Sequence, residues 1–550
     1  MNKDKLKPML FSNMKQYSKE QFIKDVVSGI IVAIIALPLS IALALASGVG
    51  PEQGLYTAIV AGFIISFLGG SRVQIAGPTA AFATIVAGIV ARNGMGGLAL
   101  ATMMAGIILI LLGVLRLGNL IKFIPYTITT GFTAGIAVTI VIGQIKDFFG
   151  LSFPQGTPTV ETMEKMNAII KNFGTYNYEA LIVGLVCLAV LVVWPKVSRK
   201  IPGSLIAVLV GIGMVKIFKM NVNTIGDLYT ISNKLPAFTL PEFSFNGVKT
   251  VFSDAFTIAV LAAIESLLSC VVADGMTGSH HRSNMELIAQ GAGNIGSALF
   301  GGIPATGAIA RTAANIKNGG RTPVAGMVHS VVLVLILVIL MPYAALIPMP
   351  TIAAILFMVA YNMCQWRTFF HLCKTAPKSD ILVLVITFAL TVIFDLVVAI
   401  EVGMILAGIL FMKRMSDEAE VKGWKYFDSE EGNDPDAISL KTVPKHVRVY
   451  EITGPMFFGM SSLISTITLK EYTRCLIIRM RGVPALDITA LRSLEDLYEN
   501  CKKNNVVLIF SHVNEQPYHT MEKAGFIEKV GKDNFCANID ASLARAKDIK

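Results

Sequence analysis

Long apolar runs occupy most of residues 26–414 and are separated by short polar connections. A stretch of about 20 apolar residues is long enough to cross a bilayer as an α-helix. The runs predict helices at 26–47, 55–69, 78–91, 97–115, 125–145, 179–195, 203–218, 254–276, 285–300, 305–316, 323–341, 346–361, 379–395 and 398–412. The pattern therefore predicts an all-α polytopic membrane domain over residues 26–414, with about fourteen transmembrane segments.

Two of these segments, 78–91 and 305–316, are too short to span a bilayer, and we interpret them as half-helices. Each begins at a turn that contains Gly and Pro, Gly77-Pro78 in the first case and Gly302-Ile303-Pro304 in the second. A helix that begins inside a membrane leaves amide N–H groups and its positive dipole end there, so an anion is stabilised at that point. Paired broken helices in two halves of a chain are typical of a transporter's substrate site.

The polar stretch 219–253 divides the domain into two halves of seven predicted segments each. An odd number of segments makes the second half inverted relative to the first, so the two half-helices meet head to head. Basic residues are concentrated in alternate connections, which predicts that both chain termini are cytoplasmic. Residues 1–25 are polar and basic without a cleavage signal, so we expect a retained cytoplasmic N-terminal segment.

The pattern changes after residue 414. Residues 415–437 are acidic and contain Gly, which is typical of a solvated linker. Beyond the linker, short strand and helix patterns alternate, with strands at 447–453, 474–480 and 506–511 and helices at 490–503 and 517–524. This alternation predicts a small cytoplasmic α/β domain over residues 438–550.

Composition narrows the possible functions. An apolar share of 54% with only 15% charged residues excludes an ordinary soluble protein. The net charge of +10 lies in connections between apolar runs, so it indicates membrane topology rather than nucleic-acid binding. The seven Cys form no C-x-x-C pair, and no hydrolase or nucleotide-binding motif occurs. We therefore expect neither an enzyme nor a bound metal or cofactor.

Arg311 lies in the first turns of the second half-helix. A cation at membrane depth costs at least ~3 kcal/mol unless it is paired or hydrated, so we predict that Arg311 binds an anion together with nearby amides. The predicted anion-binding positions on the two half-helices are Thr79, Ala80, Ala81, Ala310, Arg311 and Thr312. The alternative is that Arg311 extends toward a cytoplasmic boundary, near Lys317 and Arg321.

Glu265 lies midway along the predicted helix 254–276, among apolar neighbours. A carboxyl group at this depth is costly to keep charged and can exchange a proton near neutral pH, which makes Glu265 a candidate proton-coupling group. Two alternatives are a structural carboxylate fixed by a neighbouring helix and an ion pair with Arg311. An ion pair is compatible with coupling, because an arriving anion or proton would release it.

In the first predicted helix, Pro38 interrupts the apolar run shortly before Ser40 and Leu43. The Ser40 hydroxyl is positioned to donate to a substrate, and we include both Ser40 and Leu43 in the predicted substrate site. A packed kink, with the Ser40 hydroxyl bonded to its own helix, explains the same residues equally well.

Several motifs together resemble the SulP family of anion transporters, also called solute carrier family 26. They are Glu265-Ser-Leu-Leu-Ser-Cys-Val-Val-Ala-Asp274-Gly, Gly77-Pro78-Thr79-Ala80, Gly307-Ala-Ile-Ala-Arg311-Thr and Gly454-Pro-Met-Phe-Phe458-Gly. The C-terminal region resembles a STAS domain through Val483-Pro-Ala-Leu-Asp487-Ile-Thr489.

The resemblance implies a UraA-like fold of two inverted seven-helix repeats, in which a core carries the anion past a gate by elevator-like movement. It also implies a homodimer in the plasma membrane, which is the inner membrane in bacteria. Ala310 stands where some members have Ser, so backbone amides must replace a hydroxyl there. Ser269 stands where sodium-coupled relatives have Asp, which favours proton coupling. Thr489 matches a position that is phosphorylated in bacterial STAS proteins, so it is a possible regulatory site for a soluble partner.

These observations predict a secondary active transporter of sulfate or a related small anion, coupled to protons and embedded in a lipid bilayer. Bicarbonate and dicarboxylate remain alternative substrates, because amides with one Arg accept any of these anions. A passive anion channel or exchanger and a STAS-linked membrane sensor are alternative functions. A nucleobase transporter of the same architecture would need acidic or amide side chains directed at a ring instead of Arg311.

Overall fold

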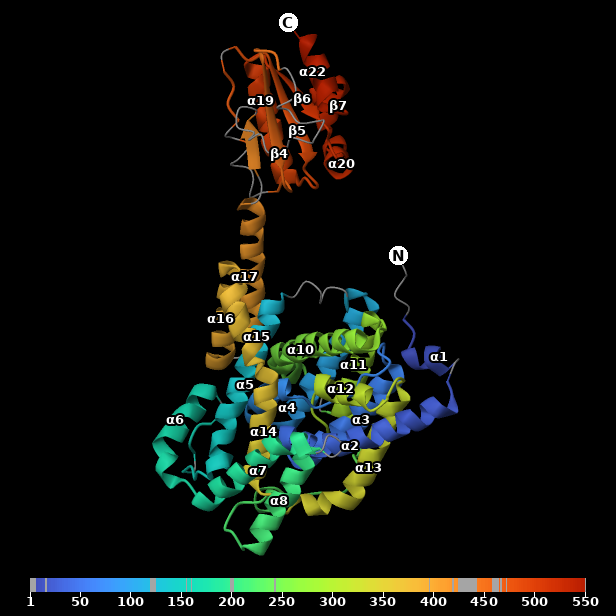
Figure 1. Cartoon of the computed structure of the whole chain (residues 1–550), viewed down its shortest axis with the longest axis vertical. Helices are drawn as coiled ribbons and strands as arrows, with labels where there is room; N and C mark the ends of the chain where they lie inside the picture. Colours follow the sequence, from blue (N-terminus) through green and yellow to red (C-terminus); the bar gives the residue numbers. More distant parts are fainter. Residues whose placement is uncertain are drawn as a thin grey trace. The chain divides into compact units, whose positions relative to one another are not determined.

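The computed structural model describes residues 6–549 except 15–16, 119–124, 155, 160, 198–201, 242–243, 395, 418–419, 424–442, 458–463, 465–466 and 471. The chain forms two compact units, residues 1–404 and residues 405–550. The first unit consists almost entirely of helices, whereas the second is built around a sheet (Figure 1).

The helices of the first unit follow the apolar runs of the sequence. They are α1 (Met9–Asn13), α2 (Lys19–Ala46), α3 (Pro51–Leu68), α4 (Ala80–Val114), α5 (Tyr126–Phe149), α6 (Thr162–Asn172), α7 (Tyr178–Val197), α8 (Gly203–Ile217), α9 (Ile225–Leu228), α10 (Phe245–Thr277), α11 (Ser283–Leu299), α12 (Ile309–Lys317), α13 (Val324–Ala344), α14 (Met349–Cys364), α15 (Trp366–Thr375), α16 (Lys378–Ile393) and α17 (Leu396–Asp417), which continues into the second unit. A short 3₁₀ helix, Phe173–Thr175, follows α6. Each predicted run overlaps one of these helices, with 78–91 and 97–115 both in α4, and α1, α6, α9 and α15 lie outside the predicted runs.

The helix α4 is broken at Gly94, where φ is 65° and ψ is −174°. A residue with a side chain is strongly disfavoured in this conformation, so Gly divides α4 into two straight parts. In the described part of the chain, eight helical stretches are long and apolar enough to cross a membrane. The prediction of fourteen spans in two inverted repeats stays a prediction.

The long helices are apolar on both faces because one face packs and the other meets lipid. On α13, Leu333 and Leu337 are fully buried, whereas Leu335 and Ile339 are 57% and 62% exposed. Such all-round hydrophobicity is expected of membrane-spanning helices.

Small residues bring α4 and α11 into backbone contact. A Cβ atom on Gly106 would lie 2.6 Å from the Gly291 carbonyl oxygen, and one on Gly113 would lie 2.6 Å from the Asn284 carbonyl oxygen. Close approach through small residues is a common way to pack helices in membranes.

Two very short strands join the two halves of the membrane unit. The strand β1 (Ala76–Gly77) pairs antiparallel with β2 (Thr306–Gly307), and the Ala308 amide donates to the Ile75 carbonyl over 2.9 Å. The pairing brings the start of α4 beside the start of α12. Sequence analysis missed these strands, because two residues are too few to show an alternating pattern.

The second unit contains a five-stranded sheet in the order β3-β4-β5-β6-β7. Its elements are β3 (Glu420–Gly423), β4 (Val447–Thr453), β5 (Cys475–Gly482), α19 (Ile488–Lys503), β6 (Val507–Ser511), α20 (Glu515–Lys523), α21 (Phe526–Val530), a 3₁₀ helix (Lys532–Asn534), β7 (Phe535–Cys536) and α22 (Ile539–Lys547). The strand β3 runs antiparallel to β4, and the remaining neighbours are parallel. The strands and helices predicted from the sequence are therefore present, and the α/β fold is confirmed.

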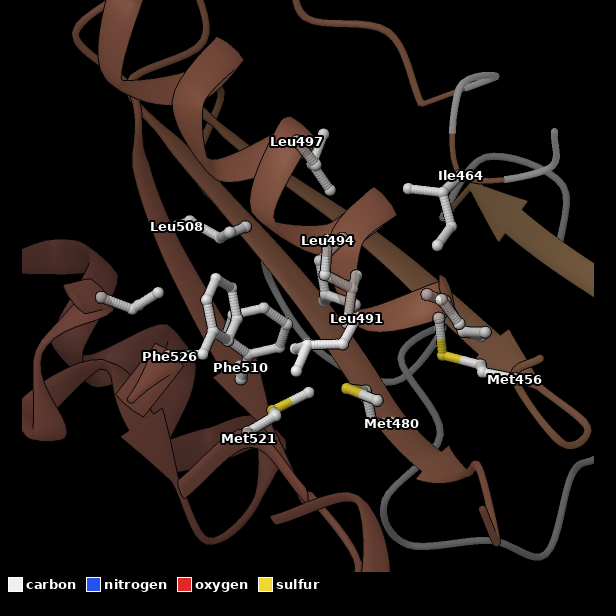
Figure 2. Close-up of a cluster of buried hydrophobic side chains, with 14 of the residues drawn as sticks. Met456, Ile464, Met480, Leu491, Leu494, Leu497, Leu508, Phe510, Met521 and Phe526 are labelled. Atoms are coloured by element: carbon white, nitrogen blue, oxygen red, sulfur yellow. The ribbon is translucent and has the colours of Figure 1, made fainter. Parts of the chain in front are cut away.

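The main core of this unit lies between α19 and one face of the sheet (Figure 2). Leu491, Leu494 and Leu497 repeat at helical spacing and face Met480 and Phe510 of the strands. Of the predicted linker 415–437, residues 415–417 continue α17 and 420–423 form β3, while 418–419 and 424–437 lie outside the described residues.

Candidate anion site

The N-termini of α4 and α12 form the centre of the candidate site. Thr79 is the N-cap of α4 and Ala308 is the N-cap of α12, and neither described helix start has a side-chain cap. The first amides that donate a helical hydrogen bond are that of Phe82, to the Thr79 carbonyl, and that of Thr312, to the Ala308 carbonyl. The amides before them are therefore available for an anion.

Arg311 lies between these helix starts and is only 1% exposed. Its Nη2 donates to Ser40 Oγ over 3.3 Å and to the Pro78 carbonyl over 3.1 Å. Its Nε and Nη1 are buried and have no hydrogen-bond partner among the described residues. The side chain thus stays inside the protein, contrary to the alternative that it extends to a cytoplasmic boundary.

Gly77 provides the space that Arg311 occupies. A Cβ atom at Gly77 would collide with Arg311 Nη1. The chain before the first half-helix must therefore lack a side chain at this position, which gives a packing reason for the Gly of the Gly77-Pro78 turn.

Ser40 is fully buried on α2, and its hydroxyl accepts from Arg311. Pro38 has no amide N–H, so the regular helical hydrogen bond to the Ile34 carbonyl is missing just before Ser40. Leu43 is also buried, but its carbonyl accepts from the Ser47 hydroxyl over 2.7 Å. The structure thus brings Ser40 to Arg311 and gives Leu43 a packing position one turn further along α2.

Glu265 contacts the same turn from α10. Its side chain is half-buried, and Thr79 Oγ1 donates to its Oε2 over 2.9 Å. The ion pairs within the described chain do not include one between Glu265 and Arg311. Arg311 donates to the Pro78 carbonyl, whereas Glu265 accepts from the hydroxyl of the next residue, Thr79. The two charged side chains therefore bind neighbouring residues of this turn.

The remaining predicted positions differ in what they can offer. Ala80 and Ala81 are buried at the start of α4, and Ala310 is exposed at the start of α12. The Thr312 amide is used within α12, and its hydroxyl accepts from the Ile75 amide over 3.0 Å. Thr312 therefore supports β1, while Ala80, Ala81 and Ala310 retain free amides.

A buried polar network that sequence analysis missed supports the crossing strands. Gln74 Nε2 donates to Ser266 Oγ over 3.0 Å. Behind it, the fully buried Glu286 of α11 accepts from the amides of Gly70 and Ser71 over 2.8 and 3.1 Å. The signal available in the sequence was an acidic residue at the edge of the apolar run 285–300.

The family model described as the sulfate permease family matches residues 22–387. The chain belongs to this family. Its members are anion transporters rather than enzymes, as the sequence predicted. A second model, the STAS domain, matches residues 438–546.

Full-length relatives support the assignment. The chain is 40% identical over 539 residues to YvdB of Bacillus subtilis (strain 168), whose name assigns it provisionally to sulfate transport, covering 96% of this chain and 98% of YvdB. It is 30% identical over 548 residues to the bicarbonate transporter BicA of Picosynechococcus sp. (strain ATCC 27264 / PCC 7002 / PR-6), covering 95% of this chain and 94% of BicA.

Solved structures support the fold. The overall structure of SLC26A9 superposes with a TM-score of 0.87 at 19% identity, covering 98% of this chain and 92% of that one. The transmembrane domain of a cyanobacterial BicA superposes with a TM-score of 0.62 at 30% identity, covering 71% of this chain and 98% of that one. The predicted resemblance to SulP transporters with a STAS domain is therefore confirmed.

Proposed function

We propose that this protein is a secondary active transporter that binds sulfate or a related small anion between the starts of α4 and α12. The observation that carries the proposal is the fully buried Arg311, whose Nε and Nη1 lack partners in the described structure. Buried donors without partners are rare, and a cation next to uncapped helix N-termini is complementary to an anion.

We further propose that Glu265 carries the coupled proton. A charged Glu265 accepts from the Thr79 hydroxyl, whereas a protonated Glu265 is able to donate. Because Thr79 is the N-cap of α4, a change in this hydrogen bond acts directly on one wall of the anion site.

Bicarbonate is the second candidate substrate, and the 30% identity to BicA favours it. It carries one negative charge at neutral pH, whereas sulfate carries two. The free amides and the Arg311 guanidinium accept oxygen atoms of either anion.

The arrangement in the cell is part of the same proposal. We place both termini in the cytoplasm, the membrane domain at 26–414 in the bacterial inner membrane and the STAS domain at 438–550. The proposed assembly is a homodimer that transports by elevator-like movement. Thr489 is exposed in the first turn of α19, so it is accessible to a kinase and remains the proposed regulatory site.

Uptake into proteoliposomes tests this proposal. Purified protein is assayed with labelled sulfate, bicarbonate and nitrate at two pH values, with and without an inward proton gradient. We expect accumulation of sulfate above the external concentration, abolished by a protonophore. Equilibration without accumulation would instead indicate a channel, and accumulation that needs Na⁺ but no proton gradient would remove Glu265 from the coupling step.

A further inference from the structure

A buried histidine of the membrane unit has no role in the site described so far. His329 lies on α13 and is fully buried. Both ring nitrogens lack a hydrogen-bond partner in the part of the chain that the structure describes. An unsatisfied buried polar group destabilises a fold, so two of them on one side chain require an explanation.

The turn of α13 that carries His329 packs against α3 and β1. Ser330 Oγ donates to the Ala58 carbonyl over 3.3 Å. A Cβ atom on Gly62 would lie 3.0 Å from Ser330 Oγ and 3.2 Å from the Ala76 carbonyl oxygen. The His329–Ser330 turn is therefore next to the first residue of β1.

Arg311 reaches the same place from α12. Its Nη1 lies against Gly77, the second residue of β1, and a Cβ atom on Gly77 would lie 3.5 Å from Ala58 Cβ. The dipeptide Ala76-Gly77 is thus next to both Arg311 and the His329–Ser330 turn.

The other elements around His329 bring little charge. The helices α2 and α3 pack against α13, and residues 28–46 and 57–68 of these helices contain no titratable side chain. Asp25, nearer the start of α2, accepts hydrogen bonds from the Arg321 amide and the Thr322 hydroxyl at the start of α13. On α12, the other cation, Lys317, lies at the opposite end from Arg311.

Charge balance decides when His329 is able to hold a proton. With no anion bound, a protonated imidazole would add a second buried cation beside Arg311, which is unfavourable. When Glu265 is protonated, a singly charged anion is balanced by Arg311 alone. A doubly charged anion leaves one negative charge uncompensated, and a proton on His329 cancels it.

We propose that His329 takes up a proton when a doubly charged oxyanion such as sulfate binds at Arg311, and stays neutral when a singly charged anion binds there. The proton is transferred from hydronium in the solution to a ring nitrogen, so an O–H bond breaks as the N–H bond forms and a neutral water molecule is left. His329 would thus match the charge of the site to that of its substrate, separately from the coupling role proposed for Glu265. This inference rests on the proposed anion site.

Calorimetric titration of the full-length protein in detergent tests the inference. Sulfate and nitrate are titrated in two buffers of different ionisation enthalpy, which gives the number of protons taken up on binding. For the wild type we expect up to one more proton with sulfate than with nitrate. Sulfate affinity should then rise up to about tenfold for each unit that the pH falls, while nitrate affinity stays flat.

The variants His329→Gln and His329→Asn should bind nitrate normally and lose the extra proton, so that sulfate affinity no longer depends on pH. His371→Gln, on the exposed face of α15, serves as the control and should match the wild type. Equal proton uptake for sulfate and nitrate in the wild type would overturn the inference without any variant. Extra uptake that persists in both His329 variants and disappears in Glu265→Gln would overturn it too, and would assign the proton to Glu265.

Failure of the proposed function gives a different result. In that case the wild type binds neither sulfate nor nitrate at any pH. Binding of both anions with the same proton count leaves the proposed site intact and rejects only the role of His329.

Discussion

Each of the two units of this protein buries an arginine, but the two arginines differ in the partners of their guanidinium groups. Arg479 of β5 is 4% exposed, and its Nη1 donates to Glu451 Oε2 over 3.2 Å. Arg311 of α12 is 1% exposed and contacts only a hydroxyl and a carbonyl among the described residues, with two nitrogens unpartnered. The first arrangement neutralises the arginine within the fold, while the second leaves a charge that the proposed anion would neutralise.

The surroundings of the two arginines differ in the same way. On the face of β5 that carries Arg479, burial raises the pKa of the Cys475 thiol to about 12. Around Arg311 the chain instead places free helix amides, a hydroxyl and a carboxyl group. A buried arginine is therefore evidence for a binding site only when its partners within the chain fall short of its charge.

The largest expected effect is the loss of stability when Arg479, the arginine with an acidic partner, is replaced. Replacing Arg479 with Ala removes the buried cation that pairs with Glu451 and leaves a cavity in its place, so it should destabilise the second unit by about 3–5 kcal/mol. Hydrogen exchange of β4 and β5 in the full-length protein measures this loss. Arg492→Ala, on the exposed face of α19, should have little effect, and unchanged protection in Arg479→Ala would show that the ion pair does not stabilise the sheet.

The opposite result is expected for the unpaired arginine. Arg311→Ala should weaken anion binding by about 2–4 kcal/mol, because it removes a charge-assisted contact in a desolvated site. Arg311→Lys should restore only part of the affinity, since the planar fork is lost. Anion titration of purified protein measures both, with the exposed Arg92→Ala as control. Wild-type affinity in folded Arg311→Ala protein would place the site elsewhere.

A smaller effect is expected when Arg311 is retained but displaced. Gly77→Ala introduces a Cβ atom where Nη1 lies, so we expect an affinity loss of about 1–3 kcal/mol. Gly143→Ala on α5 is the matched control, because a Cβ atom there meets nothing within 4 Å. Equal affinities in the two variants would mean that the position of the guanidinium does not matter for binding.

The smallest effect on affinity is expected at Glu265. Glu265→Gln keeps the shape of the side chain but removes proton exchange, so anion binding should be nearly unchanged. Accumulation driven by a proton gradient should fall to the level seen without the gradient, and transport should become less pH-dependent between about pH 5 and 8. Uptake assays at several pH values distinguish this from a structural role, which predicts low activity at every pH. Gradient-driven uptake equal to the wild type would exclude Glu265 as the proton carrier.

Sequence reasoning located the helices and the two residues that matter most in the proposal. Long apolar runs are a strong signal, and a single charge within one, such as Arg311 or Glu265, stands out against it. His329 is likewise a single titratable residue within an apolar run, 323–341. It becomes of interest only because its ring nitrogens lack hydrogen-bond partners among the described residues, which the sequence does not show.

The crossing of β1 and β2 was beyond reach of the sequence. It pairs Ala76 with Gly307, which are far apart in the chain. Strands of two residues are too short to show the alternation of apolar and polar positions that identifies a strand in a sequence. The same applies to Glu286, whose position near a predicted helix end looks like an ordinary polar boundary. Both features depend on which segments meet in space rather than on local pattern.

The ladder between β1 and β2 has a consequence for the kinetics of transport. It pairs the residues just before α4 with those just before α12, so in the proposed elevator-like movement the groups around a bound ion would keep their places while the surrounding helices rearrange. The rate of the slow conformational step would then depend on the protein and not on which anion is bound. Ions that fit between the two helix ends should accordingly differ in the concentration that half-saturates uptake and share a similar maximal rate.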